Sequence, residues 1–356
     1  MKYRSLLLIF VVLSLMIVPA TISAQDMPDM GFCFGLDEAD CTALASAWDN
    51  MDSLVEADSS FTVDYEVAFL MSGLSEDLPL PLPEGSTDLL DSASSVVFNS
   101  SGAIDLVLDE NGEPQALGAV LDIEFGEADS ELETIPIEIR VVDGYLYLLN
   151  PETETWVGLD LEVAASDDGL MAGLEGLPFN PMTGDFDMNL LDELPDMSQM
   201  GDIDIEALLA LPGLISHVRE GDDFTFTIDF TALAALLEPE NADLFESIAG
   251  ALAMADQNIG FMFVMLPSMP FEEGSLTIVQ HVDTDLNIVD SVDISLALNV
   301  NLLQFMGQVD AEPIIINFDF AVAISNIGSA PVAVAPADFE EIDVEDLFDY
   351  FDDLDI

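Results

Sequence analysis

The sequence predicts an α+β fold, a single curved antiparallel half-barrel of about eleven strands with helices packed in its concave face. Long segments alternate apolar and polar residues, as in residues 61–71, where one face carries only apolar side chains. Turn signals such as Asp143-Gly144 join consecutive strands, which favours antiparallel neighbours. The order is strands, helices, strands without a flexible linker, so one domain is favoured over two.

The first half predicts a helix followed by a six-stranded meander. Residues 42–57 predict the helix, because apolar residues recur there three and four positions apart. Residues 72–94 are rich in Pro and Ser and predict a long loop after the first strand. The six strands are predicted at residues 61–71, 96–108, 117–125, 137–142, 145–149 and 156–161.

The second half resumes the strands after a segment of different composition. Residues 162–222 are rich in Gly, Pro, Met and Asp and predict only a short helix at 203–211. Helices are also predicted at 231–237 and 241–257. The tail, residues 338–356, is acidic and aromatic and predicts either a frayed end or a short docking helix. Further strands are predicted at residues 224–230, 259–266, 275–282, 286–300 and 314–324.

Residues 1–24 have the layout of a secretory signal peptide, with Lys2 and Arg4 before an apolar run and small residues up to Ala24. The apolar run is short for a membrane span, which needs about 20 residues, so cleavage is favoured over a retained anchor. The mature chain is therefore expected outside the cytoplasm, whether secreted, periplasmic or on the cell surface.

The charge is strongly negative, with 71 acidic residues against four basic ones and a net charge of -67. Such a field repels nucleic acid and anionic membranes. The negative charge is typical of a solubilising surface adapted to a salty, acidic or calcium-rich exterior; the alternative is that it binds a specific cationic partner.

The two cysteines, Cys33 and Cys41, lie in the N-terminal segment 25–41. In a secreted chain such a pair predicts one local disulfide that ties this segment to the following helix. A zinc site or a redox dithiol is the weaker alternative, because no histidine is near and the spacing does not suit redox chemistry.

Catalytic residue types are scarce. The only histidines are His217, expected at a turn, and His281, expected to face outward from a strand, and neither has a Gly-flanked nucleophile nearby. We therefore expect no enzyme activity and no cofactor. Acidic residues are too abundant to single out a glycosidase pair. A calcium loop is weakly suggested by the alternating Asp185, Asp187 and Asn189, although the loop glycine is replaced by Leu190.

Residues 137–161, "IEIRVVDGYLYLLNPETETWVGLDL", resemble the LolA/LppX/LprG superfamily of extracytoplasmic lipid- and lipoprotein-binding proteins. Residues 215–237 and 316–336 are similar to that superfamily's turn-strand-helix segment and closing strands. The resemblance covers residues 42–337 and implies an open half-barrel whose helices and sheet enclose an apolar cavity for acyl chains. The lipid-anchored members carry a Cys after the signal peptide, whereas Gln25 follows Ala24 here.

These observations predict a non-catalytic carrier that holds a lipid or acyl chain, with a lipoprotein or membrane-associated protein as a further partner. The alternative is an acidic extracellular structural or surface protein that binds calcium through carboxylates and has no ligand cavity. The residues expected to line the cavity also suit ordinary core packing. They are Phe61, Val63, Tyr65, Phe69, Tyr145, Tyr147, Trp156, Phe318 and Phe320.

Overall fold

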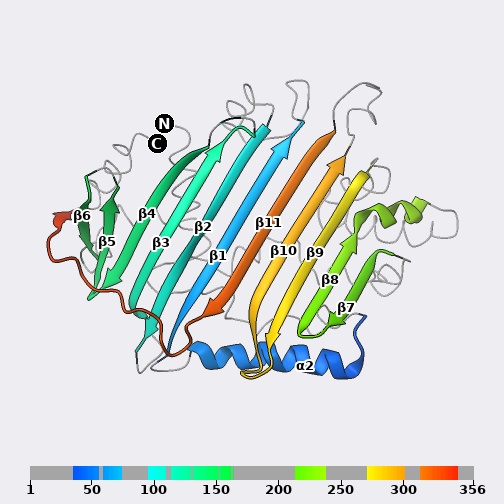
Figure 1. Cartoon of the computed structure of the whole chain (residues 1–356), viewed down its shortest axis with the longest axis horizontal. Coiled ribbons are helices and arrows are strands. Elements are labelled where there is room, and N and C mark those ends of the chain that lie inside the picture. Colours follow the sequence, from blue (N-terminus) through cyan, green and yellow to red (C-terminus); the bar gives the residue numbers. More distant parts are fainter. Residues whose placement is uncertain are drawn as a thin grey trace.

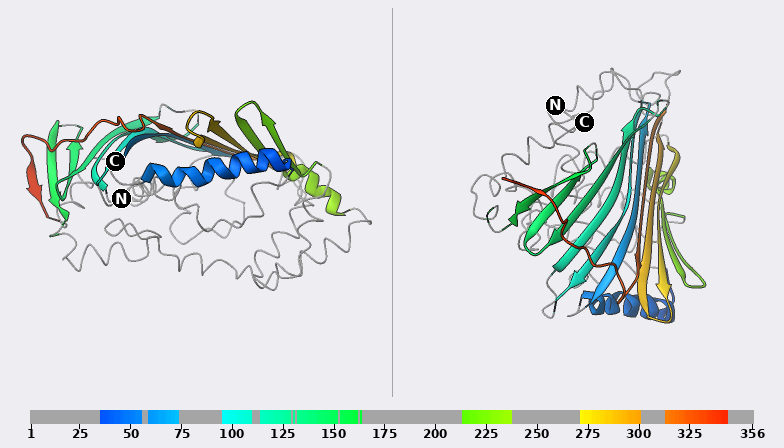
Figure 2. Two further views of the ribbon diagram at one scale, coloured as in Figure 1. Left: turned by 90° about the horizontal axis from the view of Figure 1, so that it is seen from below. Right: turned by 60° about the vertical axis from the view of Figure 1, so that its left-hand side comes forward.

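A computed structural model describes residues 35–55, 59–73, 95–109, 213–237, 271–300 and 313–343, and 114–163 except 129, 131, 152 and 162. Within these residues twelve strands form one open sheet, in the order β12-β6-β5-β4-β3-β2-β1-β11-β10-β9-β8-β7 (Figure 1). The sheet is strongly curved and a helix lies inside its arch (Figure 2). The predicted half-barrel is confirmed.

The first six strands are antiparallel neighbours in chain order, as the sequence predicts. Asp143 and Gly144 both have positive φ angles, 53° and 81°, in the turn between β4 and β5. This is the conformation for which Asp-Gly pairs are favoured in two-residue hairpins. The strands are β1 (Ser60–Ser72), β2 (Ser95–Leu108), β3 (Pro114–Gly126), β4 (Glu133–Val142), β5 (Tyr145–Asn150) and β6 (Thr155–Asp160).

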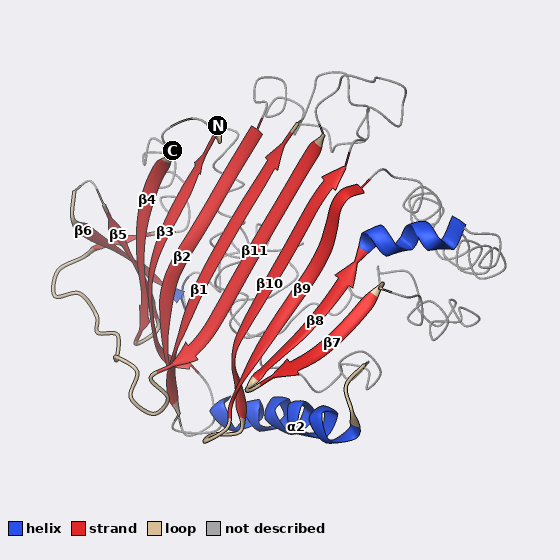
Figure 3. Ribbon diagram, turned by 45° about the vertical axis from the view of Figure 1, so that its right-hand side comes forward, coloured by secondary structure: helices blue, strands red, loops and turns tan. Residues whose placement is uncertain are grey.

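The next five strands along the chain form a second antiparallel run. Strand β11 joins this run to the first six strands by pairing with β1 (Figure 3). The segment predicted as a turn around His217 is strand β7. The predicted strand at 259–266 and the predicted helices at 203–211 and 241–257 lie outside the described residues. The elements are β7 (Ile215–Glu220), β8 (Asp223–Asp229), the 3₁₀ helix η4 (Phe230–Leu237), β9 (Phe271–Asp283), β10 (Ile288–Val300) and β11 (Ile314–Ser325).

The two faces of the sheet differ in chemistry. Opposite residues of antiparallel strands share a face, and Tyr65 lies opposite Val322 of β11 and Gly102 of β2. Following these pairs across the sheet gives a concave face of almost only apolar side chains. The convex face carries mainly Ser, Thr, Ala, Asn and acidic residues, such as the exposed Asp64 and Glu66.

Helix α2 (Glu38–Asp49) and the 3₁₀ helix η2 (Asn50–Val55) cover one end of the concave face and pack against β10. The side chain of Asp37 caps α2 by accepting hydrogen bonds from the backbone N–H groups of Ala39 and Asp40, both at 2.9 Å. The helix begins before the predicted residue 42, because this cap lies upstream of the apolar periodicity. Its apolar side buries Leu44 and Ala47 completely.

Cys41 lies in α2 and is disulfide-bonded. Cys33 lies outside the described residues, so the pairing of the two cysteines stays a prediction, as does the signal peptide at residues 1–24.

Residues 326–339, which we call the strap, leave β11 and run along the convex side toward β6 (Figures 1 and 2). The N–H of Gly328 donates to the carbonyl of Ser60 at 2.7 Å. Arg140 Nη1 donates to the carbonyl of Val334 at 3.0 Å. The strap then leads into β12 (Glu340–Ile342), which pairs with β6 in parallel. The sequence predicted a frayed end or a helix from 338; its first residues form this edge strand, and 344–356 lie outside the described residues.

Candidate functional site: the concave apolar face

Six of the nine predicted cavity-lining residues share the concave face. Phe61, Val63, Tyr65 and Phe69 of β1 lie on the same face as Phe318 and Phe320 of β11, and Phe69 is directly opposite Phe318. The first three are buried, with exposures of 0%, 5% and 6%, whereas Phe69, Phe318 and Phe320 are half-buried. Burial therefore decreases along the strands away from α2.

The other three predicted residues lie on the convex face. Tyr147 is opposite Arg140 and Gly158, and Tyr145 is opposite Asp160. Trp156 shares their face, because it alternates with Gly158 and Asp160 along β6. The structure thus separates these three from the six residues of β1 and β11. The concave side of the same hairpin is formed by Leu146, Leu148, Val157 and Leu159.

The convex aromatic residues hold the strap. Phe339 packs edge-on against Tyr147 with ring centroids 5.0 Å apart, and lies 5.9 Å from Tyr145. Gly158 allows this approach, because a Cβ there would lie 2.6 Å from the Phe339 ring. Burial raises the pKa of Tyr147, and the nearby Asp160 carboxylate is the main cause of the raised pKa of Tyr145.

Arg140 connects the strap to the remaining aromatic residue. Its guanidinium lies 4.4 Å from the centre of the Trp156 ring, in addition to its hydrogen bond to the strap and an ion pair with Glu138 at 2.7 Å. The apolar residues on both faces of the β5–β6 hairpin therefore have two different covers, the core on one side and the strap on the other.

Several apolar residues that were not predicted as cavity-lining extend the concave face beyond β11. Ile294 and Leu296 of β10 lie opposite Phe320 and Phe318, and Ile278 of β9 lies opposite Ile294. All three are half-buried. For Ile294 and Leu296 the signal was the alternation of residues 288–300, which marks a face but does not identify its neighbours.

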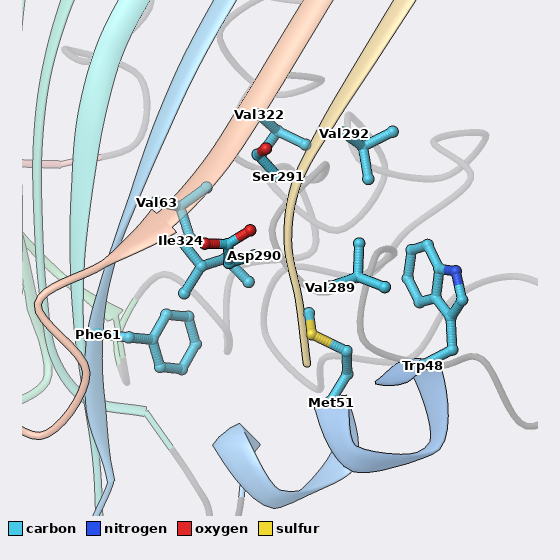
Figure 4. A pocket seen from close by; sticks show the side chains of 10 residues that line it. All are labelled: Trp48, Met51, Phe61, Val63, Val289, Asp290, Ser291, Val292, Val322 and Ile324. Carbon is cyan, nitrogen blue, oxygen red and sulfur yellow. The ribbon is translucent and has the colours of Figure 1, made fainter. Parts of the chain in front are cut away.

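A small cavity of about 20 Å³ lies where β1, β10 and β11 approach the end of α2 (Figure 4). This volume admits about one water molecule, whereas small-molecule sites usually enclose about 300–1,000 Å³. The cavity is therefore the inner end of the concave face and not a lipid-sized chamber. It is lined by Trp48, Met51, Phe61, Val63, Val289, Asp290, Ser291, Val292, Val322 and Ile324.

Two polar pairs on this face are satisfied within the protein. Trp48 Nε1 donates to Gln280 Oε1 at 2.7 Å, and Gln280 is only 2% exposed. The hydroxyls of Tyr65 and Ser100 are 3.0 Å apart. His217 is also buried on this face and packs edge-on against Phe226, so it fills space rather than presenting a ring nitrogen to solvent.

His281 faces outward from β9, as predicted. Its Nδ1 lies 2.6 Å from Asp223 Oδ1 of β8, and Nε2 lies 4.0 Å from Asp290 Oδ1 of β10. The hydrogen bond to Asp223 is the main cause of the raised pKa of His281. Burial is the main cause of the raised pKa of Asp290.

Metal and membrane features are limited in the part of the chain that the structure describes. No group of three or more His, Cys, Asp or Glu side chains there is arranged to hold a metal ion. The weak calcium candidates Asp185, Asp187 and Asn189 lie outside it. In the turn between β9 and β10, the Asp283 carboxylate is used for local hydrogen bonds: its Oδ1 accepts from the backbone N–H groups of Asp285 and Leu286. None of the described helices is long and apolar enough to cross a membrane.

No known protein family and no curated protein matches the sequence. Among solved structures, the chain is similar to one that shows lipid–protein interactions in lipovitellin, with 7% identity and a TM-score of 0.28. The match covers 80% of this chain but 27% of that one. LprF from Mycobacterium bovis matches with 13% identity and a TM-score of 0.23, over 83% of this chain and 96% of LprF.

A beta-barrel-like protein of unknown function from Brucella abortus matches with 8% identity and a TM-score of 0.16, over 76% and 98% of the two chains. TM-scores this low do not establish a common fold. The resemblance to the LolA/LppX/LprG superfamily therefore stays a prediction.

Proposed function

We propose that this protein binds the acyl chain of a lipid on its concave face, outside the cytoplasm, and carries it without chemical change. The supporting observation is the apolar concave face, in which buried residues near α2 continue into half-buried ones, including Phe69, Phe318 and Phe320. Alkyl chains gain about 0.8 kcal/mol for each buried CH₂ group, so even a partly covered face of this kind binds them favourably.

The opposite face supports the assignment by contrast. Its strands present acidic and small polar residues, and Tyr145 and Tyr147 of β5 are covered by Phe339 of the strap. An apolar ligand therefore has one suitable side of the sheet.

Trp48 offers a direct test, because it lies on the concave side and the chain has only one other tryptophan, Trp156, on the convex side. In a Trp156→Phe background, a pyrene-labelled long-chain alcohol should quench Trp48 by energy transfer in a saturable manner. Phe318→Ser should weaken binding of the alcohol by about tenfold, because it removes apolar contact area.

Asn317→Ser is the matched control, since Asn317 neighbours Phe318 but faces the convex side. Its affinity should equal that of the parent. Absence of saturable binding, or equal losses in the two variants, would reject acyl binding on this face. Mass spectrometry of lipids extracted from protein purified from its own host would then identify the natural ligand.

A further inference from the structure

His281 lies between carboxylates of two other strands on the convex face. Its Nδ1 is 2.6 Å from Asp223 Oδ1 of β8, and its Nε2 is 4.0 Å from Asp290 Oδ1 of β10. Asp290 is the extra residue of a β-bulge between Val289 and Ser291, and bulges commonly re-aim a side chain. One imidazole ring therefore connects the three neighbouring strands β8, β9 and β10.

The charged groups around this ring are all acidic. Outside residues 1–24 the sequence has only two Lys or Arg residues, Arg140 and Arg219. Arg140 contacts the strap and Arg219 pairs with Asp40 of α2, so within the described residues His281 is the cation that offsets these carboxylates when it is protonated. The acidic groups are Glu220 of β7, Asp222 of the β7–β8 turn, Asp223 of β8, Asp283 of β9, and Asp290 and Asp293 of β10.

The β7–β8 hairpin forms one edge of the sheet, and its attachment is concentrated at its turn. There Phe224 is fully buried in the main core, and Arg219 Nη1 lies 2.8 Å from Asp40 Oδ1 of α2. At the other end of the hairpin, Leu214 and Leu233 belong to a small core of their own. Besides the β8–β9 ladder, contacts at the turn thus hold the hairpin to the rest of the sheet, and His281 is the contact whose charge changes near neutral pH.

From this geometry we propose that protonated His281 clamps the β7–β8 hairpin to the sheet, and that its deprotonation loosens this edge of the concave face. The imidazolium attracts Asp223 on one side and Asp290 on the other, whereas the neutral ring leaves like charges that repel each other. The hydrogen bond to Asp223 is the main cause of the raised pKa of His281. The clamp is therefore complete below about pH 6.5 and is lost as the pH rises through the folded-state value.

Loosening of the hairpin affects the concave face directly. Phe226 of β8 lies opposite Ile278 of β9, and both are half-buried. Separating β8 from β9 exposes this part of the apolar face and gives a bound alkyl chain a way out. An acyl chain should therefore dissociate faster at alkaline pH. This regulatory role rests on the proposed acyl-binding function, whereas the loosening itself does not.

Hydrogen exchange of the full chain at about pH 6 and about pH 9, with each rate divided by the intrinsic rate at that pH, tests the clamp. In the parent, protection of peptides from residues 215–229 should be about 2- to 5-fold lower at the higher pH, which is the range for an exposed ion pair. Peptides from the strap should show no such change, because Arg140 stays charged at both pH values.

Two substitutions of His281 should fix the hairpin in its two states. His281→Arg keeps a positive charge at both pH values, so protection should stay high. His281→Gln has no charge, so protection should be low at both. Asp293→Asn is the matched control, because it removes an exposed carboxylate of β10 and should retain the pH dependence of the parent. Thermal unfolding checks that the variants fold.

The outcomes separate the clamp from acyl binding. A parent without pH-dependent protection in 215–229, or a His281→Arg variant that keeps this dependence, would overturn the clamp even if His281→Gln failed to fold. Stopped-flow dissociation of the pyrene-labelled alcohol should be about 2- to 5-fold faster at pH 9 in the parent and independent of pH in His281→Arg. Equal dissociation rates at both pH values in the parent would overturn the regulatory role. Switching of the hairpin without saturable alcohol binding would reject the proposed function while supporting the clamp.

Discussion

Truncating Phe339 to alanine should release the strap without unfolding the sheet. Phe339 is 40% exposed, and full burial of such a side chain is worth about 1.5–3 kcal/mol, so its buried part contributes about 1–2 kcal/mol. The edge-on contact with Tyr147 adds about 0.5–1.5 kcal/mol. Phe339→Ala should therefore destabilise the closed strap by about 2 kcal/mol, which is about a 30-fold change in the opening equilibrium.

Hydrogen exchange followed by mass spectrometry measures this opening. Peptides from residues 326–343 should exchange about 30-fold faster in Phe339→Ala, because exchange of locally opening amides follows the local free energy. Peptides from β1 should be unchanged, since β1 is held by β2 and β11. Val332→Ala is the matched control, because Val332 lies on the strap but is 63% exposed. Unchanged exchange in 326–343, or equal acceleration in β1, would refute the proposed role of Phe339.

Three further predictions concern buried hydrogen bonds, pH and salt. Gln280→Leu leaves Trp48 Nε1 without its acceptor and should lower the free energy of unfolding by about 1–3 kcal/mol in urea titrations; an unchanged midpoint would contradict this. The folded-state pKa of His281 is raised, so its stabilising contribution is complete below about pH 6.5 and is lost as the pH rises through the folded-state value. The melting temperature of the parent should therefore exceed that of His281→Gln at acidic pH and converge with it at alkaline pH, and a constant difference would refute the linkage. With 71 acidic and four basic residues, the melting temperature should rise between about 0.1 and 1 M KCl as repulsion is screened, and a salt-independent value would contradict that reasoning.

The sequence was most informative where a strand is covered on one face only. Residues 61–71 and 314–324 carry an apolar residue at every second position, and the structure places these alternate residues on the concave side. Alternation assigns a face but no partner, so the pairing of β1 with β11 was not predictable from it. Strand β7 was missed because it is short and includes polar residues such as His217 and Arg219 on its inward side.

The β5–β6 hairpin shows why the candidate site was only partly predictable. Its strands are apolar on both faces, and such strands either line a cavity or are covered twice. The second cover here is the strap, about 180 residues farther along the chain, where Phe339 contacts Tyr145 and Tyr147. No local pattern relates the two segments. Tyr145, Tyr147 and Trp156 therefore suggested a cavity, whereas the structure places the two tyrosines against Phe339 of the strap and Trp156 against Arg140.

The register of the sheet also explains how so acidic a chain keeps its strands paired despite the many carboxylates on the convex face. Asp64 lies opposite Ala323 and Ala103, and Asp319 lies opposite Ala68 and Ser295. Like charges directly opposite each other destabilise a sheet, and these small neighbours keep each carboxylate open to water. The acidity is thereby placed on the side away from the apolar face.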